Sequence, residues 1–364
     1  MKARLRGTFC DNQDGDGPLA DTVRINIGLQ GGGAHGAFTW GVLDRLLDED
    51  WLEIAGISGT SAGALNGAAL KSGLLAGGNA GAQEQLRWLW GQIGALDHAA
   101  LPDWMMAWLP APALVSRSLE YAPGFAAIDA ATRMASPYAW GALYRHPLRE
   151  IVDQFDFRRV CDDAGPYFVV GATSVRDGKI RLFEGARIDT DAILASACLP
   201  TLFQAVELED PQTGTREAFW DGGYTGNPAL FPLFRADLPD DIVVVNINPL
   251  KRDALPVTPP EIQNRINEIS FNTSLLRELR AIDFVQRLQD DGLLERGAMA
   301  RPLIHMIADD ALMNDLSVAT KLVPVPSVLE QLRQAGRRAA GDFLRAHREA
   351  LGRRQTTDLR AMFQ

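Results

Sequence analysis

The order of apolar and polar residues near the start of the chain predicts alternating strands and helices. An apolar run at 23–29 predicts a strand, a glycine-rich turn follows at 30–36, and residues 37–50 carry apolar side chains at helical spacing. A second apolar run at 52–57 leads through a tight turn into a helix of small residues at 64–72. This alternation is typical of a parallel sheet covered by helices.

The same pattern continues through most of the chain. Further strands are predicted at 167–172, 180–183, 219–220, 242–247 and 303–307, and helices at 259–291 and 325–351. Residues 83–145 interrupt it, because they hold five of the eight tryptophans and read as an irregular, mostly helical insertion. We therefore expect a loose arm at 1–20, an α/β domain at 21–250 that carries the insertion, and a helical extension at 251–364 packed on the same domain.

Composition narrows the class of protein without revealing a function. Lys and Arg number 36 against 46 Asp and Glu, a net charge of −10 that disfavours a nucleic-acid binder. No signal peptide or membrane-spanning run is visible, and three widely spaced cysteines suggest a reducing compartment. We expect a soluble, cytoplasmic globular protein. The 34 glycines are clustered rather than spread, and the clusters carry the candidate chemistry.

The first cluster is Gly59-Thr60-Ser61-Ala62-Gly63, which fits G-x-S-x-G between a predicted strand and a predicted helix. A nucleophilic serine at the apex of a sharp turn needs neighbours without side chains, so that a substrate carbonyl can approach. The helix that follows directs the positive end of its dipole at the same point. Short motifs of small residues also arise by chance, so this one gains weight from its position between strand and helix.

The second cluster, Gly31 to Gly36, lies at the preceding strand-to-helix junction. Its backbone N–H groups could hold a phosphate or the oxyanion of a tetrahedral intermediate. A dinucleotide site would place an acidic residue about twenty positions further on, where this chain has Ser58 to Ser61 instead. The lysine of a P-loop is also missing. The oxyanion interpretation is therefore favoured.

A serine nucleophile needs a base, and none of the five histidines lies in a loop typical of a catalytic triad. His305 alternates with apolar residues in a predicted strand, which is more typical of a core histidine. Asp221 is the other candidate, because it ends a short strand and precedes Gly222 and Gly223. Alone, Asp-Gly is simply a turn signal. The acidic pairs at 162–163 and 309–310 read as solvated turns, and we predict no metal site and no cofactor.

Together, the three motifs resemble the patatin-like phospholipases, a family of lipid acyl hydrolases. That family has a glycine-rich loop, then G-x-S-x-G, then Asp-Gly-Gly or Asp-Gly-Ala, in the order found here at 31–36, 59–63 and 221–223. The segment 192–200 also resembles the family's helix ahead of the aspartate. Many members carry Arg or Lys where this chain has His35, which is a departure from the pattern.

The resemblance implies a three-layer α/β sandwich with a mostly parallel central sheet. It also implies a Ser–Asp dyad in which Ser61 attacks a lipid ester and Asp221 accepts its proton. By the same resemblance an acyl-enzyme forms and is hydrolysed by water. The implied oxyanion hole consists of N–H groups of Gly31, Gly32, Gly33 and Ala62.

Two other functions remain open from the residues alone. One is an α/β-hydrolase esterase with a Ser–Asp–His triad that includes His305, and the other is an inactive lipid-binding protein. Two segments could contact a membrane peripherally. These are the tryptophan-rich stretch 88–140 and the C-terminal segment 333–360, where eight arginines face three acids, a local charge of +5. The alternative for the second segment is a helix that packs on the core and exposes its basic side chains only to water. The sequence does not reveal the oligomeric state.

Overall fold

The structure is a computed structural model that describes residues 22–94, 111–120, 122, 136–295 and 297–363. Its described strands form one sheet with the order β5-β6-β3-β2-β1-β7-β8, and β4 pairs with β3. The strands are β1 (Val23–Leu29), β2 (Leu52–Gly59), β3 (Tyr167–Ser174), β4 (Ile180–Glu184), β5 (Val206–Glu209), β6 (Arg216–Asp221), β7 (Asp241–Asn246) and β8 (Leu303–Ala308). Each predicted strand is present, and β5 is an addition to them.

The sheet is mostly parallel, as predicted. β3, β2, β1, β7 and β8 run in the same direction, while β4, β5 and β6 form an antiparallel edge. Ser61 follows the carboxyl end of β2, and the turn after β1 meets it at the same edge because β1 and β2 are parallel neighbours. Loops that follow adjacent parallel strands are the usual place for a binding site in an open α/β sheet.

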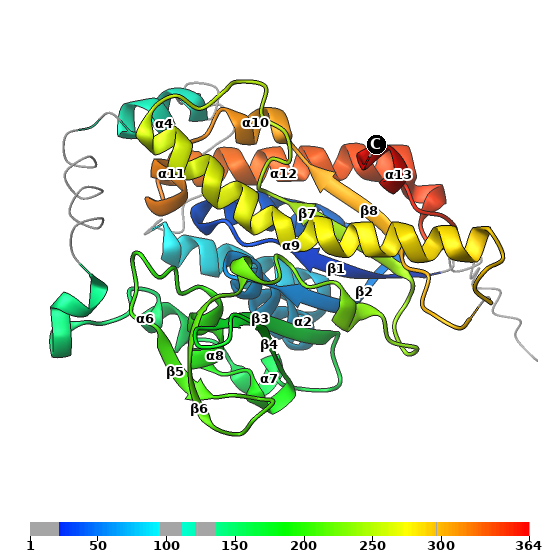
Figure 1. Cartoon of the computed structure of the whole chain (residues 1–364), viewed down its shortest axis with the longest axis horizontal. Helices are drawn as coiled ribbons and strands as arrows, with labels where there is room; N and C mark the ends of the chain where they lie inside the picture. Colours follow the sequence, from blue (N-terminus) through cyan, green and yellow to red (C-terminus); the bar gives the residue numbers. More distant parts are fainter. Residues whose placement is uncertain (1–21, 95–110, 121, 123–135, 296, 364) are drawn as a thin grey trace, which may run out of the picture.

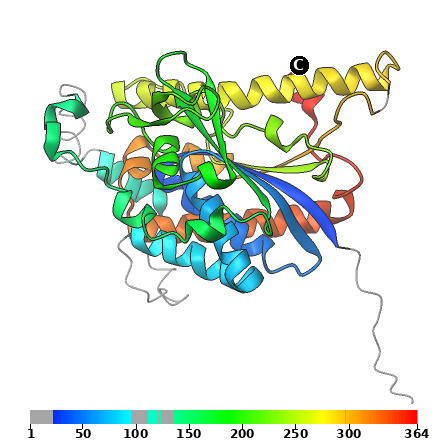
Figure 2. The same cartoon turned by 90° about the horizontal axis from the view of Figure 1, so that it is seen from below.

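Helices cover both faces of the sheet and complete three layers. Helix α9 (Pro259–Asp290) lies on one face, and α1 (Gly36–Leu46), α2 (Ala62–Ile93) and α12 (Pro326–His347) lie on the other, as Figures 1 and 2 show. The remaining helices are short: α4 (Pro112–Glu120), α6 (Arg149–Val152), α7 (Phe157–Val160), α8 (Thr190–Ser196), α10 (Asp310–Asn314), α11 (Val318–Leu322) and α13 (Leu359–Met362).

Two hydrophobic cores hold the layers together. The larger core packs α1, α2 and α12 on the sheet, and the smaller core joins Leu275, Leu279 and Ile282 of α9 to the other face. After their first residues, the strands at the centre are buried on both faces, as expected for a parallel sheet covered by helices on each side. Within the described residues, no helix combines the length and apolarity needed to cross a bilayer.

Helix α2 is longer than predicted and contains a reversal. Its backbone leaves helical geometry at Gly77 and Gly78, and Gly78 has a φ of +61°, which favours glycine. The second segment folds back on the first, so that the Trp90 Nε1–H donates to Asn66 Oδ1 at 2.9 Å. Residues 83–93, expected to open the insertion, therefore belong to the core layer.

The rest of the predicted insertion is only partly described. Helix α4 packs on α11, where the hydroxyls of Ser116 and Ser317 lie 2.9 Å apart. Most of the other insertion residues, together with the predicted arm at 1–20, lie outside the described residues.

The basic C-terminal helix is a packing element rather than a free amphipathic surface. The backbones of α1 and α12 touch, and a Cβ on Gly336 would lie 2.1 Å from the Phe38 carbonyl oxygen. Arg333 and Arg337 both bind Asp44 Oδ2, at 2.8 and 2.7 Å. The apolar face of α12 is buried, so this helix fits the core-packed alternative and cannot insert that face into lipid.

The Asp44 carboxylate should be a major stabilising contact between α1 and α12. Asp44→Ala leaves Arg333 and Arg337 largely buried without their shared partner, so we expect the free energy of unfolding to fall by about 2 kcal/mol. Urea denaturation of the purified chain measures this. Arg345→Ala is the matched control, because Arg345 pairs with Asp342 in the open, and its loss should leave stability nearly unchanged. Equal effects of the two variants would contradict the prediction.

Candidate active site

Ser61 lies in a strained turn between β2 and α2. It has a φ of 55° and a ψ of −123°, and it alone among the described non-glycine residues has a positive φ. The turn closes tightly on both sides of the serine. A Cβ on Gly59 would lie 2.6 Å from the Gly63 carbonyl oxygen, and one on Gly63 would lie 2.1 Å from that of Leu29. The two motif glycines are therefore required by close backbone contact.

The glycine loop after β1 lies directly against this turn. A Cβ on Gly31 would come within 2.6 Å of Ser61 Cβ, and one on Gly36 within 2.7 Å of Ala62 Cβ. The Ser61 N–H donates to Ser196 Oγ at 2.9 Å, and the Ser196 hydroxyl donates to the Gly171 carbonyl at 2.7 Å. Ser196 at the end of α8 thus orients the turn. It lies in the segment 192–200 highlighted in the sequence, but its contact with Ser61 was not foreseen.

Asp221 reaches the same point from the antiparallel edge of the sheet. It ends β6 and pairs with Ala172 of β3. A Cβ on Gly222 would lie 2.1 Å from the Gly171 carbonyl oxygen, so the Asp-Gly-Gly turn sits close against β3. The Thr60 hydroxyl, next to Ser61, donates to the Gly226 carbonyl at 2.7 Å. These contacts bring two motifs that are far apart in the sequence into one site.

The carboxyl group of Asp221 is fully buried and only half satisfied. Its Oδ1 accepts the Gly223 N–H at 2.8 Å, while Oδ2 has no hydrogen-bond partner among the described residues. Burial raises the pKa of Asp221 to about 7, against smaller opposing effects of the Gly223 N–H and the Ser61 hydroxyl. Ser61 is therefore close enough to influence the carboxylate without forming a complete hydrogen bond. A carboxyl with this pKa can accept a proton near neutral pH.

A buried amide network holds the glycine loop, and the sequence did not reveal it. Gln30 Oε1 accepts the backbone N–H groups of Ile247 and Asn248, and its Nε2 donates to the Asn227 carbonyl and to Asn272 Oδ1. Asn248 Nδ2 donates to the Gly31 carbonyl at 2.7 Å. No motif in the sequence marks these amides, since they come from four separate segments.

This network changes the expected oxyanion donors. The Gly31 N–H donates to Asn227 Oδ1 at 2.6 Å and is not free, contrary to the expectation. Among the described residues, the N–H groups of Gly32, Gly33 and Ala62 have no protein acceptor. The loop turns at Gly33, whose φ is +59°. Three free donors therefore remain on the two segments that meet at Ser61.

Comparison with known families agrees with this geometry. The family model described as patatin-like phospholipase matches residues 28–234, which is more than half of the chain and includes all three motifs. The chain belongs to the patatin-like phospholipase family. Membership implies hydrolysis of lipid acyl esters, and it supports the resemblance drawn from residues 31–36, 59–63 and 221–223.

Two solved structures are similar to this patatin-like chain at low identity. VipD from Legionella pneumophila is 13% identical with a TM-score of 0.41, over 89% of this chain and 67% of that one. The heterodimeric complex of ExoU and SpcU from the type III secretion system of Pseudomonas aeruginosa is 16% identical with a TM-score of 0.28, over 94% and 66%. The chain thus spans about two thirds of these longer chains. No curated protein matches it in sequence.

His35, where many patatin-like proteins carry a basic residue, is uncharged. Burial lowers its pKa well below the usual value, and Lys321 and Arg252 lower it further. The Thr320 hydroxyl donates to the Ser317 carbonyl, so it accepts from His35 Nε2–H at 2.9 Å. The imidazole therefore ties the glycine loop to α11 and supplies no positive charge.

His305 lies on β8, the edge strand of the patatin-like sheet, and β1 and β7 separate it from β2. Its Nε2 lies 2.9 Å from Asp241 Oδ1, and its Nδ1 lies 3.0 Å from Thr356 Oγ1. Asp241 begins β7, whereas Ser61 follows the end of the parallel strand β2, so the two groups are at opposite ends of the sheet. A triad of Ser61 with His305 does not fit this geometry. His305 is the satisfied core histidine that its sequence pattern favoured.

An apolar cavity of about 530 Å³ opens beside Ser61. No described histidine lines it. Trp90, which belongs to the segment predicted as a tryptophan-rich insertion, forms part of its wall from the buried core of α2. Its other apolar lining residues are Leu65, Ile93, Leu148, Ile151, Leu199, Leu202, Phe203, Leu322 and Val323. The shape and lining suit a hydrocarbon chain.

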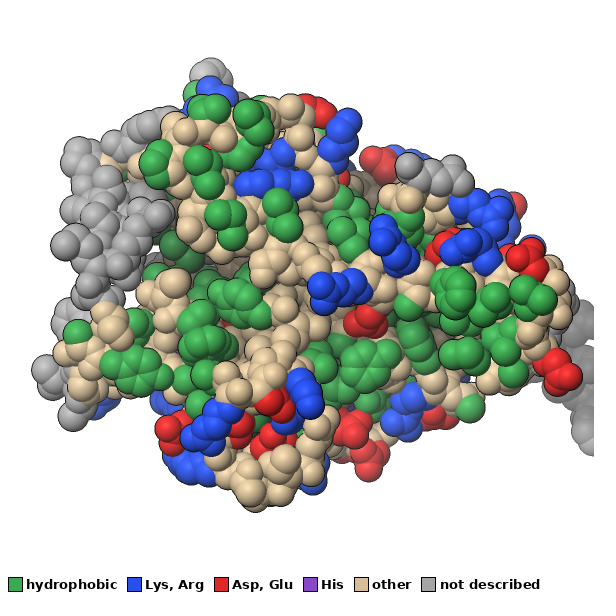
Figure 3. Space-filling view, in the orientation of Figure 1, with side chains coloured by type: hydrophobic (Ala, Val, Ile, Leu, Met, Phe, Trp, Pro, Cys, Tyr) green, Lys and Arg blue, Asp and Glu red, His purple; other side chains and the backbone are tan. Residues whose placement is uncertain are grey.

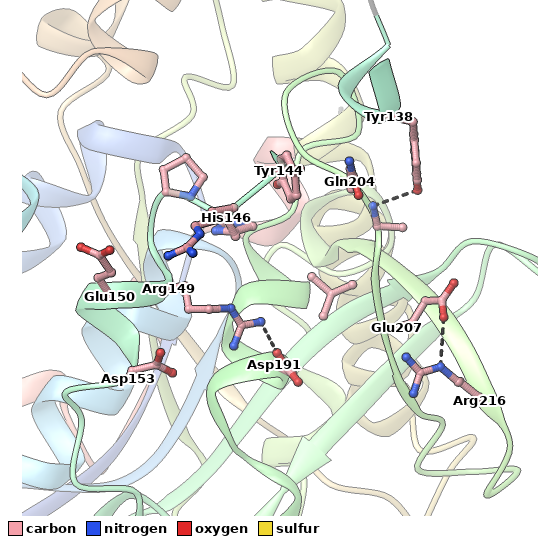
Figure 4. Close-up of a pocket in the computed structure, with 14 residues that line it drawn as sticks. Tyr138, Tyr144, His146, Arg149, Glu150, Asp153, Asp191, Gln204, Glu207 and Arg216 are labelled. Atoms are coloured by element: carbon pink, nitrogen blue, oxygen red, sulfur yellow. Dashed lines mark hydrogen bonds and ion pairs between the residues drawn. The ribbon is translucent and has the colours of Figure 1, made fainter. Parts of the chain in front are cut away.

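A second, polar cavity of about 800 Å³ adjoins the first at Pro147, which lines both. Its charges are largely paired with one another, Arg149 with Asp191 at 2.5 Å and Arg216 with Glu207 at 3.0 Å (Figure 4). His146 lines it too, and burial lowers the pKa of that imidazole to about 4. This cavity does not include Ser61, so it is a neighbour of the site rather than its centre.

The remaining candidate groups show no arrangement for catalysis. In the described part of the chain, no three His, Cys, Asp or Glu side chains are grouped so that they could hold a metal ion. Cys198 is buried, and burial raises its pKa to about 12, which keeps the thiol protonated.

Asp221 should make the protein less stable as the pH rises. Its pKa is about 7 in the folded chain and lower when unfolded, so the folded state retains a proton that the unfolded state loses. Ionising the buried carboxyl therefore costs stability, and Asp221→Asn should raise the melting temperature at pH 8. The gain should shrink toward pH 4.5, as measured by scanning calorimetry.

Asp177→Asn is the matched control for this titration. Arg181 lowers the pKa of Asp177 to about 2, so removing that carboxyl should have the opposite sign and reduce stability at pH 8. A melting temperature of Asp221→Asn below that of the wild type at pH 8 would contradict the assigned burial effect.

Proposed function

We propose that the chain is a serine hydrolase that cleaves carboxylic ester bonds of lipids through Ser61 and Asp221. The observation that carries the proposal is the unpartnered carboxylate oxygen of buried Asp221 beside the strained Ser61, at the end of an apolar cavity. Family membership supports the reaction class. The proposed residues and steps rest on the geometry described above.

In the first step Ser61 Oγ attacks the ester carbonyl carbon while Asp221 Oδ2 takes the hydroxyl proton. The carboxyl with a pKa of about 7 is a useful base at neutral pH, and a carboxyl with an ordinary pKa would be weaker. The strained turn places the Ser61 hydroxyl at the apex of the turn, where it points away from its own backbone. Collapse of the tetrahedral intermediate then expels the alcohol, which takes the proton from Asp221, and leaves an acyl-enzyme.

The negative oxygen of the intermediate is assigned to the free N–H groups of Gly32, Gly33 and Ala62. Ala62 is the first residue of α2, so the dipole of that helix adds to the attraction. Gly31 keeps a supporting role, because its backbone is held by Asn227 and Asn248. Preorganised donors of this kind lower the barrier most when they need no movement during the reaction.

Water completes the cycle. Asp221 takes a proton from a water molecule that attacks the acyl carbon, and Ser61 recovers its hydrogen as the fatty acid leaves. The apolar cavity is assigned to the acyl chain, because its lining offers hydrocarbon contacts along most of its wall. Ser61 does not line the adjoining polar cavity, so we assign that cavity to polar parts of a substrate and not to bond cleavage.

Replacing the two proposed catalytic residues should abolish hydrolysis of a soluble ester such as p-nitrophenyl butyrate. We expect kcat to fall on the order of a millionfold for Ser61→Ala and ten-thousandfold for Asp221→Asn. His305→Gln is the matched control and should keep near wild-type activity, with its fold checked by circular dichroism. Fluorophosphonate labelling followed by peptide mapping should place the adduct on Ser61.

Two outcomes would reject the proposal in different ways. An inactive but folded His305→Gln variant would favour a triad. A folded wild-type chain that neither hydrolyses esters nor takes up the fluorophosphonate would favour a lipid-binding protein without catalysis.

Narrowing the apolar cavity should change the preferred chain length. Leu202→Trp places a larger side chain in the wall, so we expect kcat/KM for p-nitrophenyl palmitate to fall roughly tenfold while the butyrate ester is hydrolysed at a similar rate. Leu293→Trp, at an exposed position outside the cavity, controls for surface effects. Equal losses on both esters would show that the cavity does not hold the acyl chain.

A further inference from the structure

The outward face of helix α9 carries a stripe that the fold itself does not use. The residues of the stripe follow one another along the helix at intervals of three or four residues, if Thr273 is counted between Ile269 and Arg277. They therefore lie on one side of the helix. They are Ile262, Ile266, Ile269, Arg277, Arg280, Phe284 and Arg287, and we call this set the α9 stripe. From first to last it extends for ~38 Å at the rise of an α-helix.

The apolar side chains of the stripe are open to solvent. Ile262, Ile266 and Ile269 are 43%, 53% and 52% exposed, and Phe284 is 53% exposed. The opposite side of the helix is fully occupied, since Leu275 and Leu279 pack on the sheet there. Single exposed apolar residues are normal on protein surfaces, but three exposed isoleucines within two helical turns form a cluster, and such clusters mark interaction surfaces. In Figure 3 hydrophobic and basic side chains follow the course of α9 across the face shown.

The arginines of the stripe retain positive charge at the surface. Among the described residues Arg277 has no acidic partner. The Arg280 guanidinium lies 4.8 Å from the ring centre of Phe363, which leaves its charge in place, and Arg287 pairs with Asp283 at 3.0 Å. Basic groups and exposed apolar groups on the same helix face are typical of a surface that lies on anionic lipid.

The segment of α9 that carries the isoleucines contacts α11, whose end lines the proposed acyl cavity. Lys321 Nζ contacts Asn264 Oδ1 and Glu268 Oε1 of α9, at 3.4 and 3.3 Å. The next two residues, Leu322 and Val323, line the cavity and are 37% and 36% exposed. Asn264 and Glu268 are buried, so α11 packs against the inner side of the same segment of α9 that carries the isoleucines on its outer side.

We propose that the α9 stripe is the surface on which the protein docks to a lipid layer with anionic headgroups. The isoleucines would enter the interface and the arginines would contact the headgroups. This inference rests on the proposed function, because a surface that binds a lipid layer would bring the enzyme to its proposed substrate. It also replaces the C-terminal helix as the membrane contact, since the apolar face of α12 is buried against α1.

The test uses the full chain with Ser61→Ala, so that binding is measured without hydrolysis. Flotation with phosphatidylcholine vesicles, with and without phosphatidylglycerol, gives the bound fraction. We expect binding to vesicles that contain phosphatidylglycerol, weakening as salt rises. Adding Ile266→Glu and Ile269→Glu should reduce binding on the order of tenfold or more. Leu293→Glu with Met299→Glu, two exposed residues off the stripe, is the matched control and should leave binding unchanged.

Three results would overturn the proposal. The first is that the Ser61→Ala chain binds neither kind of vesicle. The second is that the isoleucine double variant binds vesicles as well as the Ser61→Ala chain does. The third is that light scattering finds the Ser61→Ala chain as a dimer and the double variant as a monomer. The last result would assign the stripe to a second copy of the chain. The proposed function is judged separately, because without Ser61→Ala the double variant should hydrolyse soluble p-nitrophenyl butyrate like the wild type. A wild type that binds vesicles but hydrolyses no ester would reject the function alone.

Discussion

The buried amide of Gln30 is the interaction on which the site depends. All of its polar atoms are used, and its partners come from the turn after Gly226, the loop after β7 and the middle of α9. A buried amide that lost one of these partners would carry a desolvation cost of about 1–3 kcal/mol, so the segments are held in one arrangement. The first three residues of the glycine loop, Gly31 to Gly33, have no side chains with which to fix their position. The loop is placed by amides that belong to other parts of the chain, and Ser61 is placed by the loop.

Much of the architecture could be predicted from the sequence. The central strands are rich in apolar residues, which identifies their positions and indicates their burial on two faces. The three motifs could also be recognised, because a tight backbone contact accepts only glycine at positions such as Gly59 and Gly63. These features depend on residues that are neighbours in the sequence, or on a single residue type that the geometry requires.

Features that depend on distant partners could not be predicted. Nothing near Gly31 indicates that Asn227 occupies its N–H, so the expected set of oxyanion donors was too large by one. Ser196 belongs to a recognised segment, but its bond to the Ser61 backbone appears only in three dimensions. The basic residues of α12 suggested lipid, whereas Asp44 on α1 accounts for two of them. The reversal at Gly77 and Gly78 brings the first part of the expected insertion into the core.

The contact between α1 and α12 has a consequence for biosynthesis. Phe38 and Gly336, whose backbones touch, are separated by most of the chain, and so are Gln30 and Asn272. During translation the turn that carries Ser61 is synthesised early, and the segments that hold it in place, including α9 and α12, are synthesised late. The nascent polypeptide therefore carries an incomplete site with an uncovered helix face until the distal segments emerge. Contacts of such long range slow folding and leave time for chaperones to act. A lipid acyl hydrolase of this family would in this way remain inactive until its synthesis is nearly finished.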